Sequence, residues 1–323
     1  MQIKDIATLL RGLPRRIAYA YYPGREDAWL LAHLMPGDTP VADLRRMGLG
    51  KLLNRPLIKP LVAGCGGTLR LQDVLALAYA THTPNWNNLS AAGAAQLNAI
   101  YADPWLDFEL SFSAWGDAEN FAWQQTSRPG TNLVIQLGFP SDHAALMGRY
   151  LSTGGRKAFE FEAHPIRLTG RPTLAWARVD LDPKTGTVLI EEVQSDWLRF
   201  VREEVEDLAA RKPRSRETRS AMLYEAALRE QYDKLWPKVM LLVALELMRD
   251  HVGCSDFYMH RPDSGAVLKN IHGAKPPKSL YSTLPKAFGF RETTHIPAFL
   301  GKRHRELRKS LGTRKPVFWH LGF

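Results

Sequence analysis

Residues 187–195 start with β-branched and apolar side chains and end in polar ones, and this stretch predicts a β-strand at the centre of a sheet. It begins with the apolar run TVLI after Lys184-Thr185-Gly186, a sequence typical of a hairpin turn. Side chains alternate along a strand, so the stretch divides between two faces. One face would carry Leu189, Glu191, Val193 and Ser195, and the other Ile190, Glu192, Gln194 and Asp196.

Acid and amide groups crowd the C-terminal end of this strand. Burying several carboxylates without partners is costly, so we expect the strand end to open into a cleft or to meet a cationic group. Arg178, on the neighbouring predicted strand, is one candidate partner for Glu192. A strand that simply runs out onto the surface is the alternative, because loops are normally polar.

The residues around this strand predict an α+β or α/β domain over residues 126–323, with a mixed, largely antiparallel sheet and packed helices. The segments 158–168 and 172–182 alternate cleanly and would form an antiparallel meander with the central strand. The segment 237–252 predicts a helix that is apolar almost all round, the main packing element on the sheet. The remaining expected elements are strands at 132–138, 255–260, 294–299 and 316–323, helices at 143–151 and 277–290, and a charged helical insertion at 198–235.

Residues 1–125 predict a separate, mostly helical domain, because apolar residues recur there every three or four positions between Pro and Gly breakers. The aromatic run near its end, residues 107–125, is typical of a sealed domain interface. The chain has 323 residues, 45% hydrophobic and 24% charged, as in an ordinary globular protein. No apolar run approaches the about 20 residues of a membrane span, and two distant cysteines favour a cytoplasmic protein with reduced thiols.

The net charge of +10 favours polyanionic partners such as nucleic acid or a phosphorylated cofactor. The excess positive charge is densest in residues 301–315. The candidate contacts to a polyanion are Lys302, Arg303, Arg305, Arg308 and Lys309.

From residue 131 onward the order is strand, helix, three antiparallel strands, helix, strand, helix, strand, strand. This order resembles the GNAT superfamily of N-acyltransferases. Tyr281, Gly289 and Phe290 in SLYSTLPKAFGF are similar to the family's last helix. Asn270 stands in the polar loop before it, and the resemblance makes Asn270, with Gln194, Ser195 and Asp196, a candidate substrate- or donor-binding residue. The segments IEEVQSDW and LYSTLPKAFGF also resemble stretches of large phage and mobile-element proteins, which implies no activity.

The resemblance implies an acyltransferase that takes an acyl group from acyl-CoA or another phosphorylated acyl donor. Glu192 and Glu191 would be the candidate general bases, because burial raises the pKa of a carboxyl group toward the working pH. Tyr281 would protonate the leaving thiolate, although a core tyrosine is an equally good interpretation. Lys278 and Lys286 could hold the phosphorylated donor, although lysines on helices are usually solvated.

One departure from the family concerns the donor. GNAT enzymes hold the CoA pyrophosphate on a glycine-containing turn after the central strand, and here that turn has Gln194, Ser195 and Asp196 with no glycine. Asp196 would repel a pyrophosphate, so we expect acetyl-CoA to bind weakly or in an unusual mode. The basic turn at 211–216 could supply a different phosphate site.

Two other classes of function stay open. A GNAT-like fold without catalysis could bind nucleic acid or act as an inhibitor through the basic C-terminal segment. A metal-dependent nuclease or nucleotidyl transferase would need carboxylates that converge on Mg²⁺, and only Glu192 and Asp196 are well placed. The histidines have no metal-binding spacing, so we assign no metal, and His260 and His272 remain candidate acid–base groups.

Overall fold

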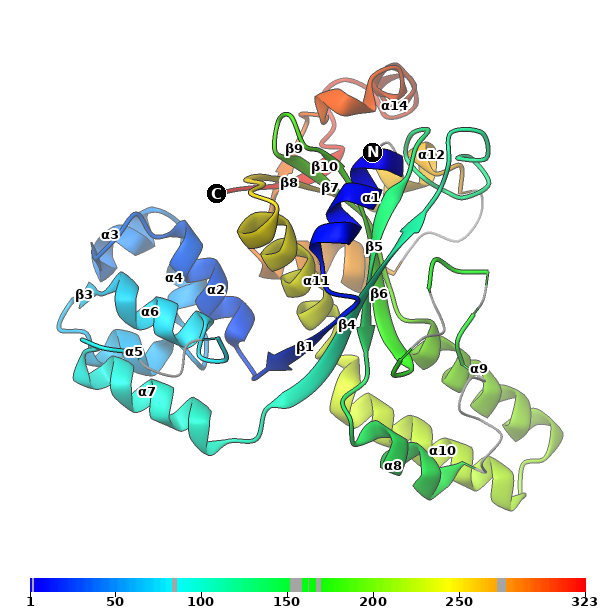
Figure 1. Cartoon of the computed structure of the whole chain (residues 1–323), viewed down its shortest axis with the longest axis horizontal. Helices are drawn as coiled ribbons and strands as arrows, with labels where there is room; N and C mark the ends of the chain where they lie inside the picture. Colours follow the sequence, from blue (N-terminus) through cyan, green and yellow to red (C-terminus); the bar gives the residue numbers. More distant parts are fainter. Residues whose placement is uncertain (2, 83–85, 152–158, 162, 167–169, 272–276) are drawn as a thin grey trace. The chain divides into compact units, whose positions relative to one another are not determined.

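The computed structural model describes the whole chain except residues 2, 83–85, 152–158, 162, 167–169 and 272–276 (Figure 1). The chain divides into two compact units. The sheet unit comprises Met1–Tyr19 and Phe108–Gly322, and the helical unit comprises Ala20–Asp107 and Phe323. The predicted boundary at residue 125 therefore differs from the observed one, because both ends of the predicted helical domain contribute to the sheet.

Among the described residues, eight strands form the large sheet, in the order β1-β4-β5-β6-β7-β8-β10-β9. The strands are β1 (Arg16–Tyr21), β4 (Leu106–Trp115), β5 (Asn132–Gly138), β6 (Thr173–Asp182), β7 (Thr187–Gln194), β8 (Asp256–His260), β9 (Arg291–Thr293) and β10 (Phe318–Gly322). Neighbours from β4 to β7 are antiparallel, as are β8 with β10 and β10 with β9, whereas β7 and β8 are parallel. The prediction of a mixed, largely antiparallel sheet is confirmed.

The meander is built from different strands than the alternation predicts. The described residues of 158–168 form turns and bends, and the rest of that segment lies outside the described residues. The third antiparallel partner is instead β5, and β4 lies in the aromatic run that the sequence assigned to a domain interface. In β4 the buried Phe108, Leu110 and Phe112 alternate with less buried residues, which is the pattern of a half-covered strand.

The last strands also differ in position. The predicted strand 294–299 is wrong, because β9 ends at Thr293 and Ala298–Leu300 forms a 3₁₀ turn, η4, directly after Pro297. Proline lacks the N–H that a strand ladder needs, which explains the early stop. The strands predicted at 255–260 and 316–323 are confirmed as β8 and β10.

Helix α11 (Trp236–Glu246), which continues as the π-helical η2 (Leu247–His251), packs on β6 and β7. All residues from Val239 to Glu246 are buried, which confirms the helix predicted from its apolar surface. The other helices of the sheet unit are α1 (Ile3–Gly12), α8 (His143–Tyr150), α9 (Asp196–Arg211), α10 (Arg216–Leu228), η1 (Arg229–Asp233), α12 (Pro262–Leu268), η3 (Ser279–Thr283), α13 (Leu284–Ala287) and α14 (Arg303–Leu311).

The helical unit packs α2 against α6, and α7 against both α5 and α6. Its elements are α2 (Arg25–Leu34), α3 (Val41–Arg46), α4 (Gly50–Leu53), α5 (Lys59–Gly64), α6 (Leu71–Ala78), α7 (Ala91–Ala102) and a small antiparallel pair, β2 (Thr39–Pro40) with β3 (Thr68–Leu69). The buried Asp73 accepts hydrogen bonds from Ser90 N and Ser90 Oγ, at 2.9 and 2.6 Å, and so fixes the start of α7. None of the described helices in either unit combines the length and apolar character needed to cross a membrane.

Candidate functional site

A β-bulge in β7 brings the two glutamates of the central strand together. Arg178 on β6 pairs with Glu192, and Val179 pairs with Ile190, so Glu191 is an extra residue in the ladder. The prediction that Glu191 and Glu192 lie on opposite faces is therefore wrong. The bulge turns both carboxylates toward the loop at 124–128. Glu191 contacts Ser127 of this loop, and Glu192 contacts Arg178 on β6, beneath the loop.

The pairing of β7 with β8 ends next to this bulge, because β8 stops at His260. Their parallel pairing runs from Thr187↔Asp256 to Ile190↔Met259, after which β7 continues to Gln194. Side chains from later elements satisfy backbone groups of β7 beyond the last pair. Lys269 Nζ donates to the carbonyl of Glu191 at 3.0 Å, and the N–H of Val193 donates to Tyr281 Oη at 3.4 Å.

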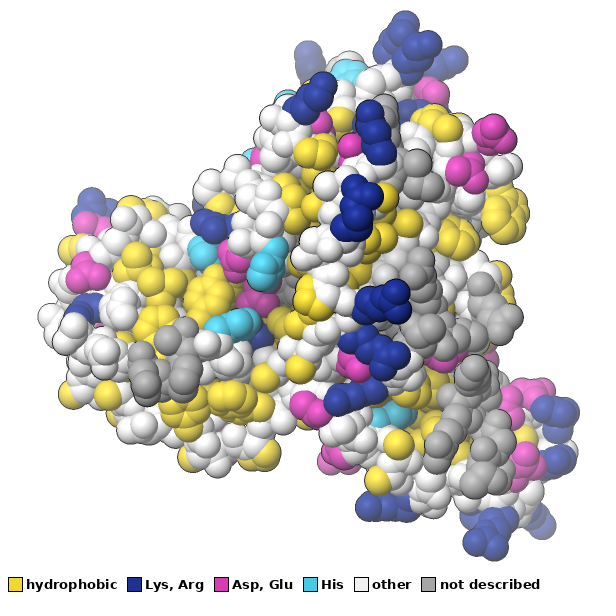
Figure 2. All heavy atoms as spheres, viewed as in Figure 1, with side chains coloured by type: hydrophobic (Ala, Val, Ile, Leu, Met, Phe, Trp, Pro, Cys, Tyr) yellow, Lys and Arg dark blue, Asp and Glu magenta, His cyan; other side chains and the backbone are white. Residues whose placement is uncertain are grey.

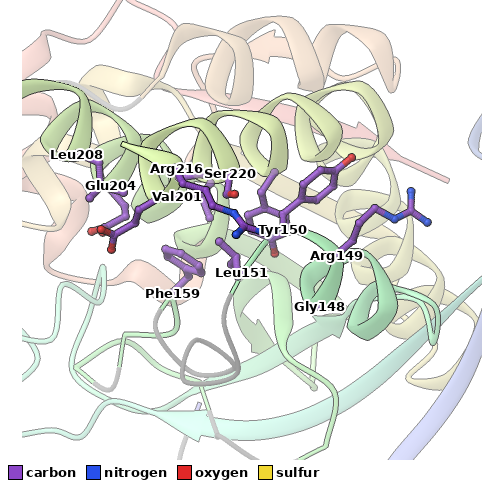
Figure 3. Close-up of a pocket in the computed structure, with 13 residues that line it drawn as sticks. Gly148, Arg149, Tyr150, Leu151, Phe159, Val201, Glu204, Leu208, Arg216 and Ser220 are labelled. Carbon is purple, nitrogen blue, oxygen red and sulfur yellow. The ribbon is translucent and has the colours of Figure 1, made fainter. Parts of the chain in front are cut away.

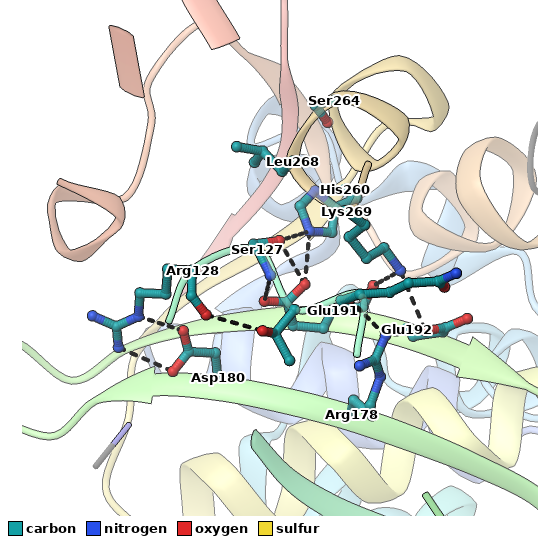
Figure 4. Close-up of polar contacts among 12 residues, drawn as sticks. Ser127, Arg128, Arg178, Asp180, Glu191, Glu192, His260, Ser264, Leu268 and Lys269 are labelled. Atoms are coloured by element: carbon teal, nitrogen blue, oxygen red, sulfur yellow. Dashed lines mark hydrogen bonds and ion pairs between the residues drawn. The ribbon is translucent and has the colours of Figure 1, made fainter. Parts of the chain in front are cut away.

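Glu192 is held between two buried cations. Its Oε2 accepts a hydrogen bond from Arg178 Nη2 and another from Lys269 Nζ at 3.3 Å (Figure 4). Burial would raise the pKa of Glu192, but the charges of Lys269 and Arg178 outweigh it and lower the pKa to about 2. Burial also lowers the pKa of the Lys269 ammonium, against the attraction of Glu192. Arg178 further donates to the carbonyls of Gln124 and Gln125, at 2.8 and 3.0 Å, and so holds the loop over the strand.

Glu191 lies in a second, fully buried cluster with Ser127 and His260 (Figure 4). Its carboxylate accepts from Ser127 N at 3.1 Å and Ser127 Oγ at 2.6 Å, and it lies 3.1 Å from His260 Nε2. Burial would raise the pKa of Glu191, but the hydrogen bond and charge of His260 outweigh it and the pKa falls to about 2. Burial in turn lowers the pKa of His260, against the hydrogen bond and the charge of Glu191.

The Ser127–His260–Glu191 cluster does not have the geometry of a hydrolase triad. In a triad the two imidazole nitrogens contact different partners, the serine on one side and the acid on the other. Here the same atom, His260 Nε2, lies 2.8 Å from Ser127 Oγ and 3.1 Å from Glu191, while His260 Nδ1 has no partner among the described residues. The cluster therefore connects the loop at Ser127 to both β7 and β8.

A pocket of about 870 Å³ lies beside the C-terminal end of β7. It is lined by the end of β7, by α9, by the segment 233–238 and by residues of η3 and α13. Four basic side chains and two acidic ones line it: Arg199, Arg202, Lys234, Lys238, Glu192 and Asp233. The wall contains apolar side chains as well, so the pocket can take a ligand with both an anionic and an apolar part.

Part of the predicted site lines this pocket and part does not. Glu192, Gln194, Ser195 and Tyr281 belong to its lining. The Asp196 carboxylate lies 2.7 Å from His164 Nδ1 and accepts from Trp176 Nε1 at 2.8 Å. Burial would raise the pKa of Asp196, but these contacts outweigh it and lower the pKa.

Three predicted binding residues are absent from the described lining of the pocket. Asn270 is exposed in a left-handed conformation (φ 53°), Lys278 is exposed at the start of η3, and Lys286 lies 5.5 Å from the Trp319 ring. Lys269, the neighbour of Asn270, is the residue that reaches the site. The sequence pattern predicts no helix at 262–268, so the direction of the Lys269 side chain could not be predicted. No sequence motif marks Ser127 as a site residue. His272 lies outside the described residues.

The basic C-terminal segment divides into structural and exposed residues. Arg303 donates to the carbonyls of Ser127 and Leu268, at 3.2 and 2.6 Å, and Arg308 donates to the carbonyl of Thr294. The residues that remain exposed are Lys302, Arg305 and Lys309, and Figure 2 shows basic side chains gathered over α14.

Another pocket, of about 700 Å³, lies between α8, α9 and α10 (Figure 3). Its wall combines Tyr150, Phe159 and Val201 with the charged Glu204 and Arg216. Arg216 belongs to the basic turn at 211–216, the alternative phosphate site that the sequence suggests, and none of the other predicted site residues belongs to the described lining of this pocket.

No group of three or more His, Cys, Asp or Glu side chains in the described part of the chain is arranged to hold a metal ion. Comparison with models of known families, with curated proteins and with solved structures found no match for this chain.

Proposed function

We propose that the sheet unit is a GNAT-like group-transfer enzyme that moves an acyl group from a phosphorylated acyl donor to an amine. One observation carries the proposal. The parallel pairing of β7 with β8 ends at Ile190 and Met259, and a pocket large enough for a donor lies beside the end of β7 that continues past the last pair. The succession of β5, α8, β6, β7, α11 and β8, with a parallel pair at β7 and β8, supports the same topology.

The charges of the pocket support an anionic donor. Ser195 caps α9 by accepting from Leu198 N at 3.4 Å, and Asp196 sits in the first turn, so the α9 N-terminus offers no glycine cradle for phosphate. The basic side chains Arg199 and Arg202 lie one and two turns further along α9. Phosphate would then be bound by side chains rather than by backbone N–H groups, which agrees with the missing glycine turn.

The chemistry assigns different roles to Glu192 and Tyr281. The amine nitrogen forms a bond to the acyl carbon, the bond to the donor thiolate breaks, and the proton that the nitrogen loses passes to solvent. Glu192, with a pKa of about 2, is a weak base and instead stabilises the positive charge that develops on the nitrogen. Burial raises the pKa of Tyr281, and the negative charge of Glu192 raises it further. The phenol therefore keeps its proton until the leaving thiolate takes it. Solvent then returns a proton to Tyr281.

Calorimetric titration with coenzyme A at physiological ionic strength tests the donor site. We expect binding that weakens roughly tenfold or more in Arg202→Ala, since a charge-assisted hydrogen bond contributes about 1.5–3 kcal/mol. Arg229→Ala is the matched control, because Arg229 pairs with Glu225 on the surface and lies outside the described lining of the pocket. Coenzyme A that does not bind, or that binds both variants equally, would refute the proposed donor site.

A second candidate function, nucleic-acid binding, is favoured by the exposed Lys302, Arg305 and Lys309 on and beside α14. By helical spacing they lie on the side of the helix opposite the buried Leu307, so all three can face one polyanion. Three phosphate contacts predict that the logarithm of the duplex-DNA affinity falls with the logarithm of salt concentration at a slope of about −2.7. A slope near zero, or one unchanged when the three residues become Gln, would exclude this surface.

A further inference from the structure

We infer that a small aromatic-lined cavity that shares Glu192 with the donor pocket is the acceptor subsite, and that it binds a planar aromatic ring carrying an amino group. The inference rests on the proposed function, because it names the acceptor of that reaction. The cavity has a volume of about 240 Å³. Its wall includes Trp115, Trp123, Phe161 and Trp176, and Arg178 and Glu192 also line it.

The position of Glu192 links this cavity to the donor pocket. Glu192 lines both, and its side chain is 15% exposed. Gln194, two residues further along β7, pairs with Trp176 on β6, as Glu192 pairs with Arg178. A ring bound between the tryptophans would therefore bring its substituent to the carboxylate that also lines the donor pocket.

The aromatic wall has open ring faces. Trp123 is 76% exposed, the highest value among the exposed large hydrophobic residues, and Phe161 is 41% exposed. Neither Trp115 nor Trp123 stacks on another ring of the described residues, whereas Phe161, His164 and Trp176 already contact one another in edge-to-face pairs. Trp115 is fixed by a hydrogen bond from its Nε1 to the carbonyl of Gln124 at 3.0 Å. One indole is therefore held in place, and the other is available to close over a ligand.

The loop that carries Trp123 is held in a strained conformation. Gln125 has a positive φ of 55°, which is costly for a residue with a side chain. The hydrogen bonds from Arg178 to the carbonyls of Gln124 and Gln125 hold the loop there. Arg178 therefore couples the position of Trp123 to Glu192, the group that would meet the reacting nitrogen.

The charges of the cavity favour a neutral ring over a cation. Aromatic cages attract cations, but a cation here would also face the buried guanidinium of Arg178, whose side chain is 2% exposed. A neutral ring stacks on indole and on guanidinium alike. An amino group on such a ring can donate to Glu192 Oε1, which accepts no hydrogen bond from the described residues, since the bonds to Arg178 and Lys269 both use Oε2.

The same amino group suits a site without a strong base. Its lone pair is delocalised into the ring, so it is uncharged at neutral pH and needs no prior deprotonation. An aliphatic amine is protonated at neutral pH and would need a base to remove that proton. Both glutamates of the site have a pKa of about 2 and are therefore weak bases. Recognition and chemistry thus point to the same class of acceptor.

Adenosine is a suitable probe, because it is an uncharged nucleoside whose flat base carries one amino group. Purine riboside differs from it only by lacking that amino group. We expect adenosine to quench tryptophan fluorescence saturably and to bind more tightly than purine riboside. Trp123→Ala should weaken adenosine binding by roughly 5- to 150-fold, the range for a stacked base. Leu223→Ala is the control, because Leu223 is 57% exposed on α10 and lies outside the described lining of the cavity.

Three outcomes would overturn the inference: no adenosine binding, equal binding by Trp123→Ala and the unchanged protein, or tighter binding of tetramethylammonium than of adenosine. The coenzyme A titration separates this result from the proposed function. Coenzyme A that binds equally to Trp123→Ala and to the unchanged protein, without any adenosine binding, would refute the acceptor class and leave the donor site intact. Adenosine binding that depends on Trp123, without coenzyme A binding, would refute the donor site and support the ring-binding cavity.

Discussion

Replacing Glu192 with Gln should destabilise the sheet unit, because it leaves two buried cations without their counter-charge. The side chains of Arg178 and Lys269 are only 2% and 3% exposed, and both donate to the same oxygen of Glu192. Glutamine keeps the shape and the hydrogen-bonding capacity but carries no charge. The change therefore removes an electrostatic interaction without creating a cavity.

The size of the effect follows from the pKa of Glu192. Its fall from 4.5 to about 2 corresponds to roughly 3 kcal/mol, at about 1.4 kcal/mol for each pKa unit. Removing one partner of a buried ion pair typically costs about 3–5 kcal/mol, which is the same range. At about 2–4 °C per kcal/mol for a unit of this size, the melting temperature should fall by roughly 6–12 °C.

Calorimetric melting at neutral pH measures this effect, and Glu217→Gln is the matched control. Glu217 pairs with Lys212 on the surface, where both side chains are more than half exposed, so the same chemical change should cost almost nothing. Adding Lys269→Met to Glu192→Gln should recover part of the loss by removing one unpaired cation. The folded-state pKa of Glu192 is depressed, so its contribution is present above pH 4.5 and is lost as the pH falls toward 2. A Glu192→Gln protein that melts with the unchanged protein at neutral pH would refute the electrostatic account.

Three further predictions test other parts of the molecule. His143 is buried and its pKa is lowered to about 4, so the unfolded chain binds a proton first as the pH falls below 6.5. His143→Gln should abolish a loss of about 1.4 kcal/mol per pH unit between pH 6.5 and 4, measured by urea unfolding; an unchanged slope would contradict it. Gly93→Ala places a Cβ 2.5 Å from Asp73 Oδ1 and should destabilise α7 by about 1–3 kcal/mol, seen as faster amide exchange there, whereas native exchange rates would show that the helix yields without cost. Tyr281→Phe should slow acyl transfer by roughly 10²–10⁴-fold while coenzyme A still binds, and full activity would remove Tyr281 from the mechanism.

Much of the central sheet could be predicted from the sequence because its apolar pattern is regular. The strand at 187–195, its neighbour at 172–182 and the apolar helix at 237–252 are all observed as β7, β6 and α11 with its extension η2. The suggestion that Arg178 meets Glu192 is also confirmed. These predictions needed only the two-residue and 3.6-residue periods of buried side chains.

The remaining errors come from features that a period cannot express. The alternation argument assumes a regular strand, and the bulge at Glu191 adds one residue without any glycine or proline to mark it. The segment 158–168 does alternate, but its aromatic side chains cover α9: Phe159 lies 5.3 Å from Trp197, and Phe161 lies 5.6 Å from Phe200. Alternation indicates which side chains are buried and not what they are buried against.

The bulge also explains why the candidate site differs from the one that the sequence suggested. By turning both carboxylates to one face, it places Glu191 against the imidazole of His260 and Glu192 against two cations, and each partner favours the ionised acid. A carboxylate that stays ionised to a pH of about 2 cannot collect a proton efficiently at neutral pH, but it can hold an N–H group and stabilise a developing positive charge. The contacts that weaken Glu192 as a base also hold the end of β7 in place, because Lys269 donates both to the Glu192 carboxylate and to the backbone carbonyl of Glu191.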